Sequence, residues 1–396
     1  MDSKDLNILI IVEGPLFISA YNKLEKKLKE KYPNIHLYSL SPSEKYEDDL
    51  NKLKNIKFDI LSARPLFIKL TTDIIKTFPT IKWMHSLAAG VEKLFTIDSL
   101  WNNDNIILSN SRGAYSEALG EAGITSMMYF SYNLYSYIEK MKNKQWSLGI
   151  NKKLQNKTLL ILGYGNNGVC LAKKAKALDM KIIGVKKNIK DSFPGKEYLD
   201  EIYTLDNLPD KSINEADFIY ATLPETKETI KIFNKDFFKK MNKNAVFMNF
   251  GRGNAVVEDD IVEALENNII RGALLDVTPN EPLNKDSKLF NISPDKLLIT
   301  DHSLAFTDDI VDTGFEFFYK NLENYIKTGK PLTIVDKNRH SINRIRVALA
   351  EHVGKSYITV SRRVQNKAQP SLEQLLQVAK VLSVSPKDLI NDIMNN

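Results

Sequence analysis

The sequence predicts an α/β protein with two doubly wound parallel β-sheets, followed by a small all-α appendage at the carboxyl end. Short apolar runs alternate with amphipathic helical patterns over most of the chain, which is typical of parallel sheets covered by helices. A glycine-rich turn joins one apolar run to a helical pattern at residues 163–168. The composition also changes abruptly after residue 337, which indicates a separate module.

The first part of the chain contains three predicted strands. Each is a short apolar run bounded by polar residues, and the runs cover 7–12, 58–62 and 81–84. A lysine-rich amphipathic helix over about 17–31 separates the first two, and the third ends at a small-residue turn, Ser86-Leu87-Ala88-Ala89-Gly90. A long helical pattern runs from about Ser116 to Lys142, in which Gly120 and Gly123 would permit close approach of another helix.

The second part repeats the alternation more regularly. A strand at 157–162 leads directly into the glycine-rich turn. Further strands separated by helices are predicted at 181–185, 217–222, 245–249, 272–276 and 297–300. A last helix over about 307–328 is closed by Gly329-Lys330-Pro331.

Composition excludes several classes of protein. The apolar and charged fractions, 43% and 26%, are ordinary for a soluble globular chain. No apolar run approaches the roughly 20 residues that cross a bilayer, and the polar residues before Ile8 do not form a signal peptide. Because Cys170 is the only cysteine, an internal disulfide is excluded, and we expect a cytoplasmic protein with no membrane partner. We predict no metal site.

Positive charge is concentrated at the carboxyl end. Residues 338–396 hold nine Lys or Arg and four acidic residues, a net charge of +5 out of the chain's +6. Five of the nine arginines also lie there, although the segment is less than a sixth of the chain. This segment is therefore interpreted as a module of different origin.

The glycine-rich turn indicates a dinucleotide site. It reads Gly163-Tyr164-Gly165-Asn166-Asn167-Gly168, follows a predicted strand and opens a predicted helix. Gly163 permits the tight turn, Gly165 lets the backbone approach a pyrophosphate, and Gly168 lets helix and strand pack closely. The N–H groups at the start of the helix would bind the phosphates.

The end of the next strand bears on the choice of cofactor. Where an acidic residue would bind the ribose 2′-hydroxyl of NAD, this chain has Lys186 and Lys187. Two ammonium groups attract a 2′-phosphate, so NADP(H) is favoured over NAD(H). The alternative is that both are solvated surface lysines and that NAD(H) is used.

Three polar residues follow successive strands at the edge where ligands bind in such sheets. Arg252 suits bidentate binding of a carboxylate and can polarise the adjacent carbonyl. His302 can give a proton to that carbonyl oxygen or remove one, and Glu281 can orient the imidazole and raise its pKa. Each residue alone has a purely structural explanation, but their joint occurrence after a dinucleotide loop predicts hydride transfer to or from a 2-oxo or 2-hydroxy acid.

With these residues in place, the chain resembles the D-isomer-specific 2-hydroxyacid dehydrogenases, which include glyoxylate/hydroxypyruvate reductases. The resemblance covers roughly residues 5–337, and its segments occur in the family's order. They are SLAAGV (86–91), ILGYGNNG (161–168), LPETKETI (223–230), MNFGRGNAVVEDD (248–260), GALLDVTPNEPL (272–283) and LLITDHS (297–303).

The resemblance implies roles for particular residues. Arg252, Glu281 and His302 match the family's catalytic residues, and the backbone N–H groups of Ala89 and Gly90 would bind the substrate carboxylate. The positions that would line the nicotinamide and ribose are Leu223, Pro224, Thr229, Phe250, Gly251 and Asp276.

It also implies an architecture. Residues 1–110 and 304–337 would form a flavodoxin-like substrate domain, and residues 111–303 a Rossmann domain that binds NAD(P), with a cleft between them. Members of this family usually dimerise through the cofactor domain, so a homodimer that uses the long helix near 116–142 is expected.

Two positions depart from the pattern or lack an assigned role. Asp301 stands where the family commonly has proline before the catalytic histidine, and its carboxylate could raise the pKa of His302 or disfavour an anionic substrate. Arg112 lies at the predicted hinge, where it either adds a substrate contact or pairs structurally.

Within the basic carboxyl-terminal segment, 338–396, residues 343–390 resemble a truncated helix-turn-helix domain of the phage-repressor type. Ser361-Arg362-Arg363 would lie on the recognition helix, with Lys355 and Lys367 near phosphates. A helix that braces this motif is missing, so the segment is either a basic appendage or a DNA-binding module. The alternative function for the chain is thus a DNA-binding regulator that senses NAD(P).

Overall fold

The computed structural model describes residues 5–226 and 228–337. The predicted helix-turn-helix segment, 338–396, lies outside the described residues. The described chain divides into two compact units. The first comprises the residues up to Arg112 and those from Val311 on, and the second is Gly113–Ile310. These divisions fall two and seven residues after the expected boundaries at 110/111 and 303/304.

The first unit is built on a five-stranded parallel sheet in the order β2-β1-β3-β4-β5. The strands are β1 (Leu6–Ile11), β2 (Ile35–Leu40), β3 (Ile60–Ala63), β4 (Trp83–Ser86) and β5 (Ile107–Asn110). The helices are α1 (Gly14–Lys31), α2 (Tyr46–Lys52), α3 (Ile68–Thr77), η1 (Glu92–Thr96), α4 (Asp98–Trp101) and α11 (Ile310–Thr328). This confirms the three predicted strands, while β2 and β5 were not predicted.

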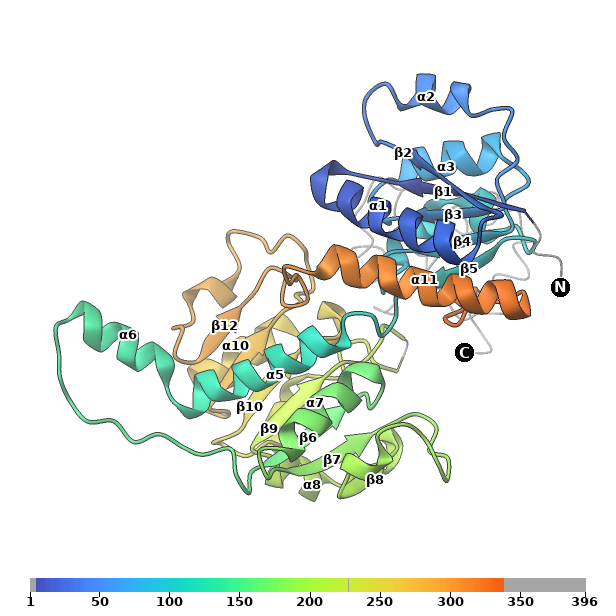
Figure 1. Ribbon diagram of the computed structural model, residues 1–396. Helices are drawn as coiled ribbons and strands as arrows, with labels where there is room; N and C mark the ends of the chain where they lie inside the picture. Colours follow the sequence, from blue (N-terminus) through green and yellow to red (C-terminus); the bar gives the residue numbers. More distant parts are fainter. Residues whose placement is uncertain (1–4, 227, 338–396) are drawn as a thin grey trace, which may run out of the picture. The chain divides into compact units, whose positions relative to one another are not determined.

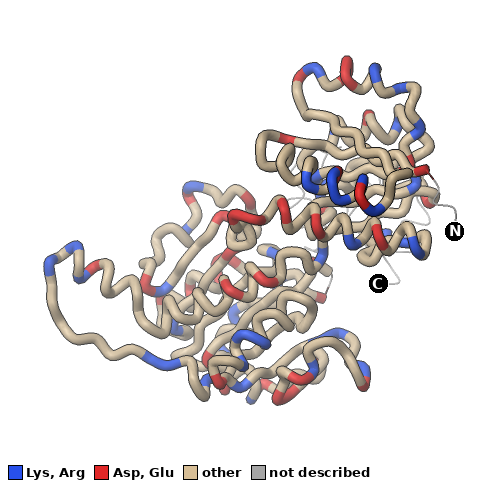
Figure 2. The backbone as a smooth tube through the Cα atoms, in the orientation of Figure 1, with Lys and Arg blue, Asp and Glu red and all other residues tan. Residues whose placement is uncertain are grey.

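Helices cover both faces of this sheet. Side chains of α1 and α11 pack with Trp83 and Ile60 on one face, and those of α3, η1 and α4 pack with Leu61 and Met84 on the other. Figure 2 shows basic residues of α1 beside acidic residues of α11. Lys23, Lys27 and Lys31 pair with Asp312, Glu316 and Glu323 at 2.6, 2.8 and 2.5 Å. Because such exposed pairs contribute little to stability, packing holds the two helices together.

The second unit is built on a seven-stranded parallel sheet in the order β12-β11-β10-β9-β6-β7-β8. The strands are β6 (Thr158–Leu162), β7 (Lys181–Val185), β8 (Glu201–Tyr203), β9 (Phe218–Ala221), β10 (Val246–Asn249), β11 (Gly272–Leu275) and β12 (Leu297–Ile299). The strand order reverses between β6 and β9, and ligands bind at such a switch point in open α/β sheets.

Helices flank this sheet as well (Figure 1). They are α5 (Ser116–Ser131), α6 (Leu134–Lys142), α7 (Asn166–Lys176), α8 (Asp210–Glu215), α9 (Lys235–Lys240) and α10 (Glu258–Glu266), with short 3₁₀ turns η2 (Lys196–Tyr198), η3 (Leu205–Asn207), η4 (Gly253–Ala255) and η5 (Lys288–Asn291). Alternate residues along the strands enter two cores. Leu160, Ile219 and Phe247 face α8–α10, whereas Leu159, Tyr220 and Met248 face α5 and α7.

The contact between α5 and α7 depends on small residues, as predicted. A Cβ at Gly120 would lie 3.2 Å from the Cys170 carbonyl carbon, and one at Gly123 would lie 2.9 Å from Leu171. Burial raises the pKa of the Cys170 thiol to about 11, which favours a packing role for this cysteine over a reactive one.

The single helix predicted over 116–142 is wrong in one respect. It breaks into α5 and α6 at Asn133, whose φ of 47° is left-handed, a conformation that asparagine tolerates better than most residues. Residues 132–153, which we call the arm, comprise α6 and an extended return (Figure 1). None of the residues of α6 is buried. Among the described residues, no helix is both long and apolar enough to cross a membrane.

Candidate active site

The glycine-rich turn lies between β6 and α7, at the switch point of the seven-stranded sheet. Gly163 has a φ of 104°, and a Cβ there would lie 2.9 Å from the Thr222 hydroxyl, so only glycine fits the turn. A Cβ on Gly168 would lie 2.9 Å from the Gly163 carbonyl and from Ile161. These two glycines therefore let strand and helix pack as closely as the turn requires.

Gly165 differs from the other two, because no atom lies within 4 Å of a Cβ built on it. It is the N-cap of α7, and no side chain caps this helix. The first N–H groups of a helix have no partner within it, and they carry positive partial charge. The space at Gly165 and these N–H groups fit the pyrophosphate of a dinucleotide.

The other three side chains of the turn have different environments. Tyr164 is buried and donates a hydrogen bond to the Gly195 carbonyl at 2.6 Å. The Asn167 amide oxygen accepts one from the Ser116 hydroxyl at 2.6 Å. The Asn166 amide lies against Gly113, where a Cβ would clash at 2.2 Å. Tyr164 and Asn167 thus support the turn, whereas the Asn166 side chain is exposed.

The two lysines after β7 have different environments. Lys186 is half-buried; its amine donates a 2.8 Å hydrogen bond to the Tyr164 carbonyl and lies 5.3 Å from the centre of the Phe193 ring. Lys187 is exposed. One ammonium group, that of Lys186, is thus attached to the backbone of the turn.

The loops after β9 and β10 approach each other closely. A Cβ on Gly251 would lie 2.7 Å from the Leu223 carbonyl oxygen, so glycine is required there. The Thr229 hydroxyl donates to the Pro224 carbonyl at 2.6 Å and closes the loop after β9. Phe250 is buried with its ring centre 4.8 Å from that of Tyr220. Thr229 and Phe250 therefore shape these loops from within, while Pro224 is exposed.

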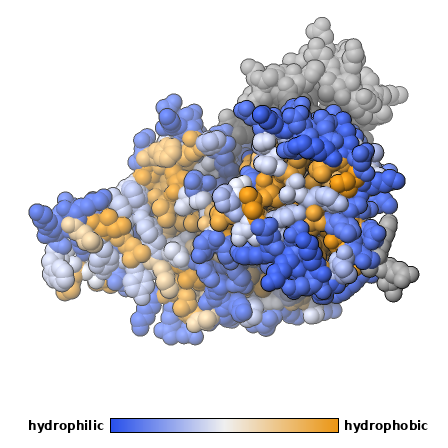
Figure 3. Space-filling view, turned by 45° about the horizontal axis from the view of Figure 1, so that its top comes forward, coloured by the Kyte–Doolittle hydropathy of each residue, from blue (hydrophilic) through white to orange (hydrophobic). Residues whose placement is uncertain are grey.

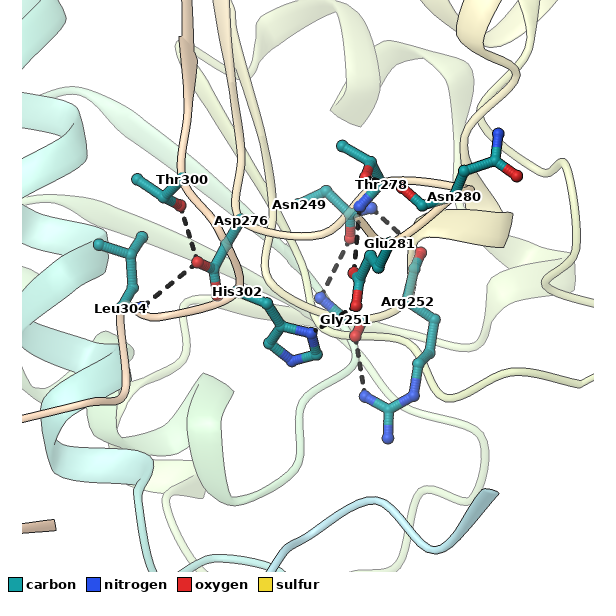
Figure 4. Close-up of polar contacts among 10 residues, drawn as sticks. All are labelled: Asn249, Gly251, Arg252, Asp276, Thr278, Asn280, Glu281, Thr300, His302 and Leu304. Atoms are coloured by element: carbon teal, nitrogen blue, oxygen red, sulfur yellow. Dashed lines mark hydrogen bonds and ion pairs between the residues drawn. The ribbon is translucent and has the colours of Figure 1, made fainter. Parts of the chain in front are cut away.

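His302 and Glu281 form an ion pair at the same edge of the sheet (Figure 4). His302 Nδ1 lies 2.9 Å from Glu281 Oε2. The other carboxylate oxygen, Oε1, accepts a 3.3 Å hydrogen bond from the Thr278 N–H. Among the described residues, none forms a hydrogen bond with His302 Nε2, and the side chain is 52% exposed. The structure thus brings together two of the three predicted catalytic residues and leaves one imidazole nitrogen accessible.

The pair shifts both pKa values towards the charged forms. The hydrogen bond that His302 donates to the Glu281 carboxylate raises the pKa of His302, and this effect outweighs the opposing effect of burial. Burial acts to raise the pKa of Glu281, but the His302 imidazole and the Thr278 N–H together hold it below its usual range. His302 therefore keeps its proton to higher pH than an ordinary histidine, as a general acid should.

Arg252 lies beside this pair, after β10. Its guanidinium donates to the Gly251 carbonyl at 2.9 Å, and its own carbonyl accepts from the Asn249 side chain at 3.1 Å. Its charge lowers the pKa of Glu281 and also acts on His302. All three predicted catalytic residues therefore belong to one electrostatic cluster.

Asp276 has a role that sequence reasoning missed. This buried carboxylate accepts a 2.7 Å hydrogen bond from the Thr300 hydroxyl and a 3.3 Å bond from the Leu304 N–H, on either side of His302. His302 itself has a φ of 59°, which costs a non-glycine residue about 1–2 kcal/mol. Asp276 thus fixes the loop in which the His302 backbone adopts its strained, left-handed conformation. No spacing signal in the sequence could have revealed this contact.

Asp301 does not act on His302 in the way we expected. Its carboxylate accepts a short hydrogen bond from the Ser303 hydroxyl, which lowers the pKa of Asp301. The carboxylates that raise the pKa of His302 are Glu281 and Asp276. Among the described residues, there is no group of three His, Cys, Asp or Glu that could hold a metal ion.

The predicted carboxylate-binding turn belongs to the first unit, after β4. Ala89 is exposed and Gly90 is half-buried. Among the described residues, neither backbone N–H donates a hydrogen bond. Arg112 is exposed and is the last residue of that unit before the chain enters the second.

A parallel sheet with a dinucleotide loop at its switch point, and an acid/base pair at the same edge, defines a class of protein. This class is that of the nicotinamide-dependent oxidoreductases, in which a group of the protein transfers a proton and the cofactor transfers the hydride.

Comparison with known proteins defines the family. A family model described as D-isomer specific 2-hydroxyacid dehydrogenase, NAD binding domain, matches residues 124–303. Glyoxylate/hydroxypyruvate reductase B of Enterobacter sp. (strain 638) is 27% identical over 70% of this chain and 84% of its own length.

Solved structures agree with this match. A D-isomer specific 2-hydroxyacid dehydrogenase family protein from Aeromonas salmonicida is 28% identical, with a TM-score of 0.67 over 84% of this chain and 99% of its own. The NADPH-dependent glyoxylate/hydroxypyruvate reductase of Sinorhizobium meliloti, solved with NADP and sulfate, is 23% identical and has the same fold, with a TM-score of 0.65 over 84% and 99%. The chain belongs to the D-isomer-specific 2-hydroxyacid dehydrogenase family, and it is an NAD(P)-dependent oxidoreductase.

Proposed function

We propose that this enzyme reduces a small 2-oxo acid, such as glyoxylate or hydroxypyruvate, to the corresponding D-2-hydroxy acid and catalyses the reverse oxidation. The observation that carries this proposal is the 2.9 Å contact between His302 Nδ1 and Glu281, with Nε2 accessible. The nicotinamide cofactor, when bound, supplies or accepts the hydride. The protein's own task is then to bind a carboxylate and move one proton.

Each residue has a defined part in that task. His302 Nε2–H gives its proton to the carbonyl oxygen in reduction, and Glu281 stabilises the imidazolium before transfer. Arg252 binds the substrate carboxylate and polarises the carbonyl. The backbone N–H groups of Ala89 and Gly90 bind the same carboxylate. We propose that the first unit binds the substrate and that the second unit binds the cofactor.

We propose NADP(H) as the preferred cofactor. The support is electrostatic: Lys186 and Lys187 follow β7, and Lys186 is attached to the glycine-rich turn through the Tyr164 carbonyl. A 2′-phosphate near these ammonium groups would gain from both of them, whereas no carboxylate follows β7 directly to bind the 2′-hydroxyl of NAD.

We also propose that the enzyme is a homodimer joined through the arm. The arm carries large apolar side chains that are exposed to solvent in a single chain (Figure 3). Trp146, Leu148 and Ile150 are about fully exposed, at 104%, 102% and 97%, and Met141 is 79% exposed. A monomer rarely leaves such a cluster in water, and a second copy of the arm offers a matching apolar surface.

The test of the reaction is the variant His302→Gln. We expect NADPH-dependent reduction of the best substrate in a panel of 2-oxo acids to fall by about 100-fold or more, because the general acid is lost. Binding of NADPH, followed by its fluorescence, should be unchanged. The matched control is His36→Gln, which changes an exposed histidine of β2. Full activity of His302→Gln would contradict the role of this imidazole.

A further inference from the structure

Two residues, Asn110 at the end of β5 and Ser111 after it, donate hydrogen bonds to three carbonyls of the turn after β4. The Ser86 carbonyl accepts a hydrogen bond from the Ser111 hydroxyl at 3.1 Å, and the Ala88 carbonyl accepts one from the Ser111 N–H at 3.1 Å. The Ala89 carbonyl accepts a bond of 2.6 Å from the side-chain amide of Asn110. Three carbonyls of the turn are thus held from the same side.

Holding a carbonyl also fixes the N–H of the same peptide unit. Both peptide bonds concerned are trans, and in a trans peptide the C=O and N–H point in opposite directions. Ser111 therefore sets the direction of the Ala89 N–H, and Asn110 sets that of the Gly90 N–H, away from β5. Among the described residues, neither N–H donates a hydrogen bond. Two adjacent N–H groups directed to one side form a site for an anion.

Asn110 is itself rigidly held, as a positioning residue must be. It is only 9% exposed. Its backbone N–H donates to the Thr333 carbonyl at 3.2 Å, and its carbonyl accepts from the Thr333 hydroxyl. Thr333 is held in turn by Asn321, a fully buried side chain on α11 that accepts from the Leu332 and Thr333 N–H groups at 2.9 and 3.2 Å.

We propose that Asn110 is a positioning residue that holds the Ala89–Gly90 peptide in the orientation that binds the substrate carboxylate. Asn110 does not contact the substrate; it acts through the peptide that it orients. This inference rests on the proposed function, since it deepens the role given there to Ala89 and Gly90.

The expected effect of losing the amide is specific. Without its donor the Ala89–Gly90 peptide can rotate, and one charge-assisted hydrogen bond to the carboxylate is weakened in the ground state and transition state alike. We therefore expect Asn110→Ala and Asn110→Asp to raise KM for the 2-oxo acid by about 10- to 100-fold, with kcat within about three-fold of the parent value. The dissociation constant of NADPH should not change, because the glycine-rich turn belongs to the other unit.

A neutral analogue separates positioning from general damage. Methyl pyruvate lacks the carboxylate, so its KM should change much less than that of pyruvate in Asn110→Asp. Oxamate binding in the presence of NADPH, followed by calorimetry, should weaken in parallel with KM for pyruvate. The matched control is Asn7→Asp, which removes another side-chain amide bond to a carbonyl of the same unit, from Asn7 to Lys57 at 2.9 Å. That control should leave both KM values unchanged.

The outcomes distinguish this inference from the proposed function. If the parent enzyme reduces no 2-oxo acid, the proposed function fails. If the parent is active but both Asn110 variants keep its KM for the acid, or lose acid and ester activity equally, Asn110 is not a positioning residue for the carboxylate.

Discussion

At the scale of single residues, the contact between His302 and Glu281 favours the protonated form of His302, which we propose as the proton donor. A carboxylate on Nδ1 places the transferable proton on Nε2 and stabilises the charged imidazole. Reduction of a carbonyl needs that charged form, and oxidation of a hydroxyl needs the neutral one. The pH dependence of the two directions therefore reports on Glu281.

Replacing Glu281 by glutamine is expected to move that pH dependence. In the parent, reduction should stay constant below the raised pKa of His302 and fall as pH rises through it. In Glu281→Gln the pKa of His302 returns towards its ordinary value of 6.5, so the fall begins at lower pH. At pH 7 kcat/KM should drop on the order of ten-fold or more. The measurement is the pH profile of kcat/KM for reduction.

Asp301→Asn provides the control for that profile. Asp301 is adjacent to His302 in sequence, but its carboxylate bonds to Ser303. Its removal should leave the profile in place. A profile that moves with Asp301 and not with Glu281 would contradict the assignment.

His85 in the first unit shows the opposite behaviour. Its burial lowers the pKa to about 3, and it is held by the Ser109 and Ser111 hydroxyls at 2.8 and 3.2 Å. Because Ser111 donates to the Ser86 carbonyl and Ser109 accepts from the Trp83 indole, Nε2 carries the proton and Nδ1 accepts. A second proton on Nδ1 would break the hydrogen bond that this nitrogen accepts from Ser109.

We expect acid to destabilise the first unit through His85. The unfolded histidine binds a proton below pH 6.5, but the folded one does not until about pH 3, so stability falls across this window as pH falls. From pH 6.5 to 5 the loss is about 2 kcal/mol. Denaturant unfolding followed by tryptophan fluorescence would measure it, since Trp83 and Trp101 are buried in this unit. In His85→Gln the loss should shrink; an unchanged pH slope would refute the assignment.

At the scale of elements, the sequence predicted the central strands of the seven-stranded sheet most directly. β6, β9 and β10 are nearly all apolar and lie in the middle of the sheet, so a short apolar run was a sufficient signal. β2 is an edge strand with exposed His36 and Ser39, and β8 has only three residues, so neither gave an apolar run. The helix breaks at Asn133 because this one residue has a left-handed φ. The helical periodicity of the apolar residues does not indicate such a change.

The same limit applies to the site. Arg252, Glu281 and His302 were predicted because each follows a strand, and strand ends meet at one edge. The contacts of Asp276 with Thr300 and of Asn110 with Ala89 join side chains to loops that are distant in sequence. Such contacts depend on the folded register and have no fixed spacing.

At the scale of elements, we propose that the end of β7 decides the choice of cofactor. We expect the parent to prefer NADPH to NADH, and the double variant Lys186→Glu/Lys187→Glu to lower the ratio of their kcat/KM values by about ten-fold or more, because a 2′-phosphate would then meet two carboxylates. The ratio cancels any damage from losing the Lys186 bond to Tyr164, which affects both cofactors. Lys190→Glu, an exposed lysine of the same loop, is the control. An unchanged ratio in the double variant would show that the two lysines are merely solvated.

At the scale of the whole molecule, the arm should control assembly. We expect the parent to sediment as a dimer and the triple variant Trp146→Lys/Leu148→Lys/Ile150→Lys as a monomer, because each lysine would place charge in an apolar contact. Phe290→Lys, which changes an apolar residue of the same unit that is 57% exposed, should remain dimeric. A monomeric parent, or a triple variant that stays dimeric, would exclude the arm as the interface.

The distribution of the three tryptophans gives this protein a built-in optical reporter. Two of them are buried in the first unit, whereas Trp146 is fully exposed to solvent in a single chain. With Trp83 and Trp101 replaced by phenylalanine, the emission wavelength would come from Trp146 alone. Its shift towards the blue on raising the concentration would record association in real time, without any attached dye.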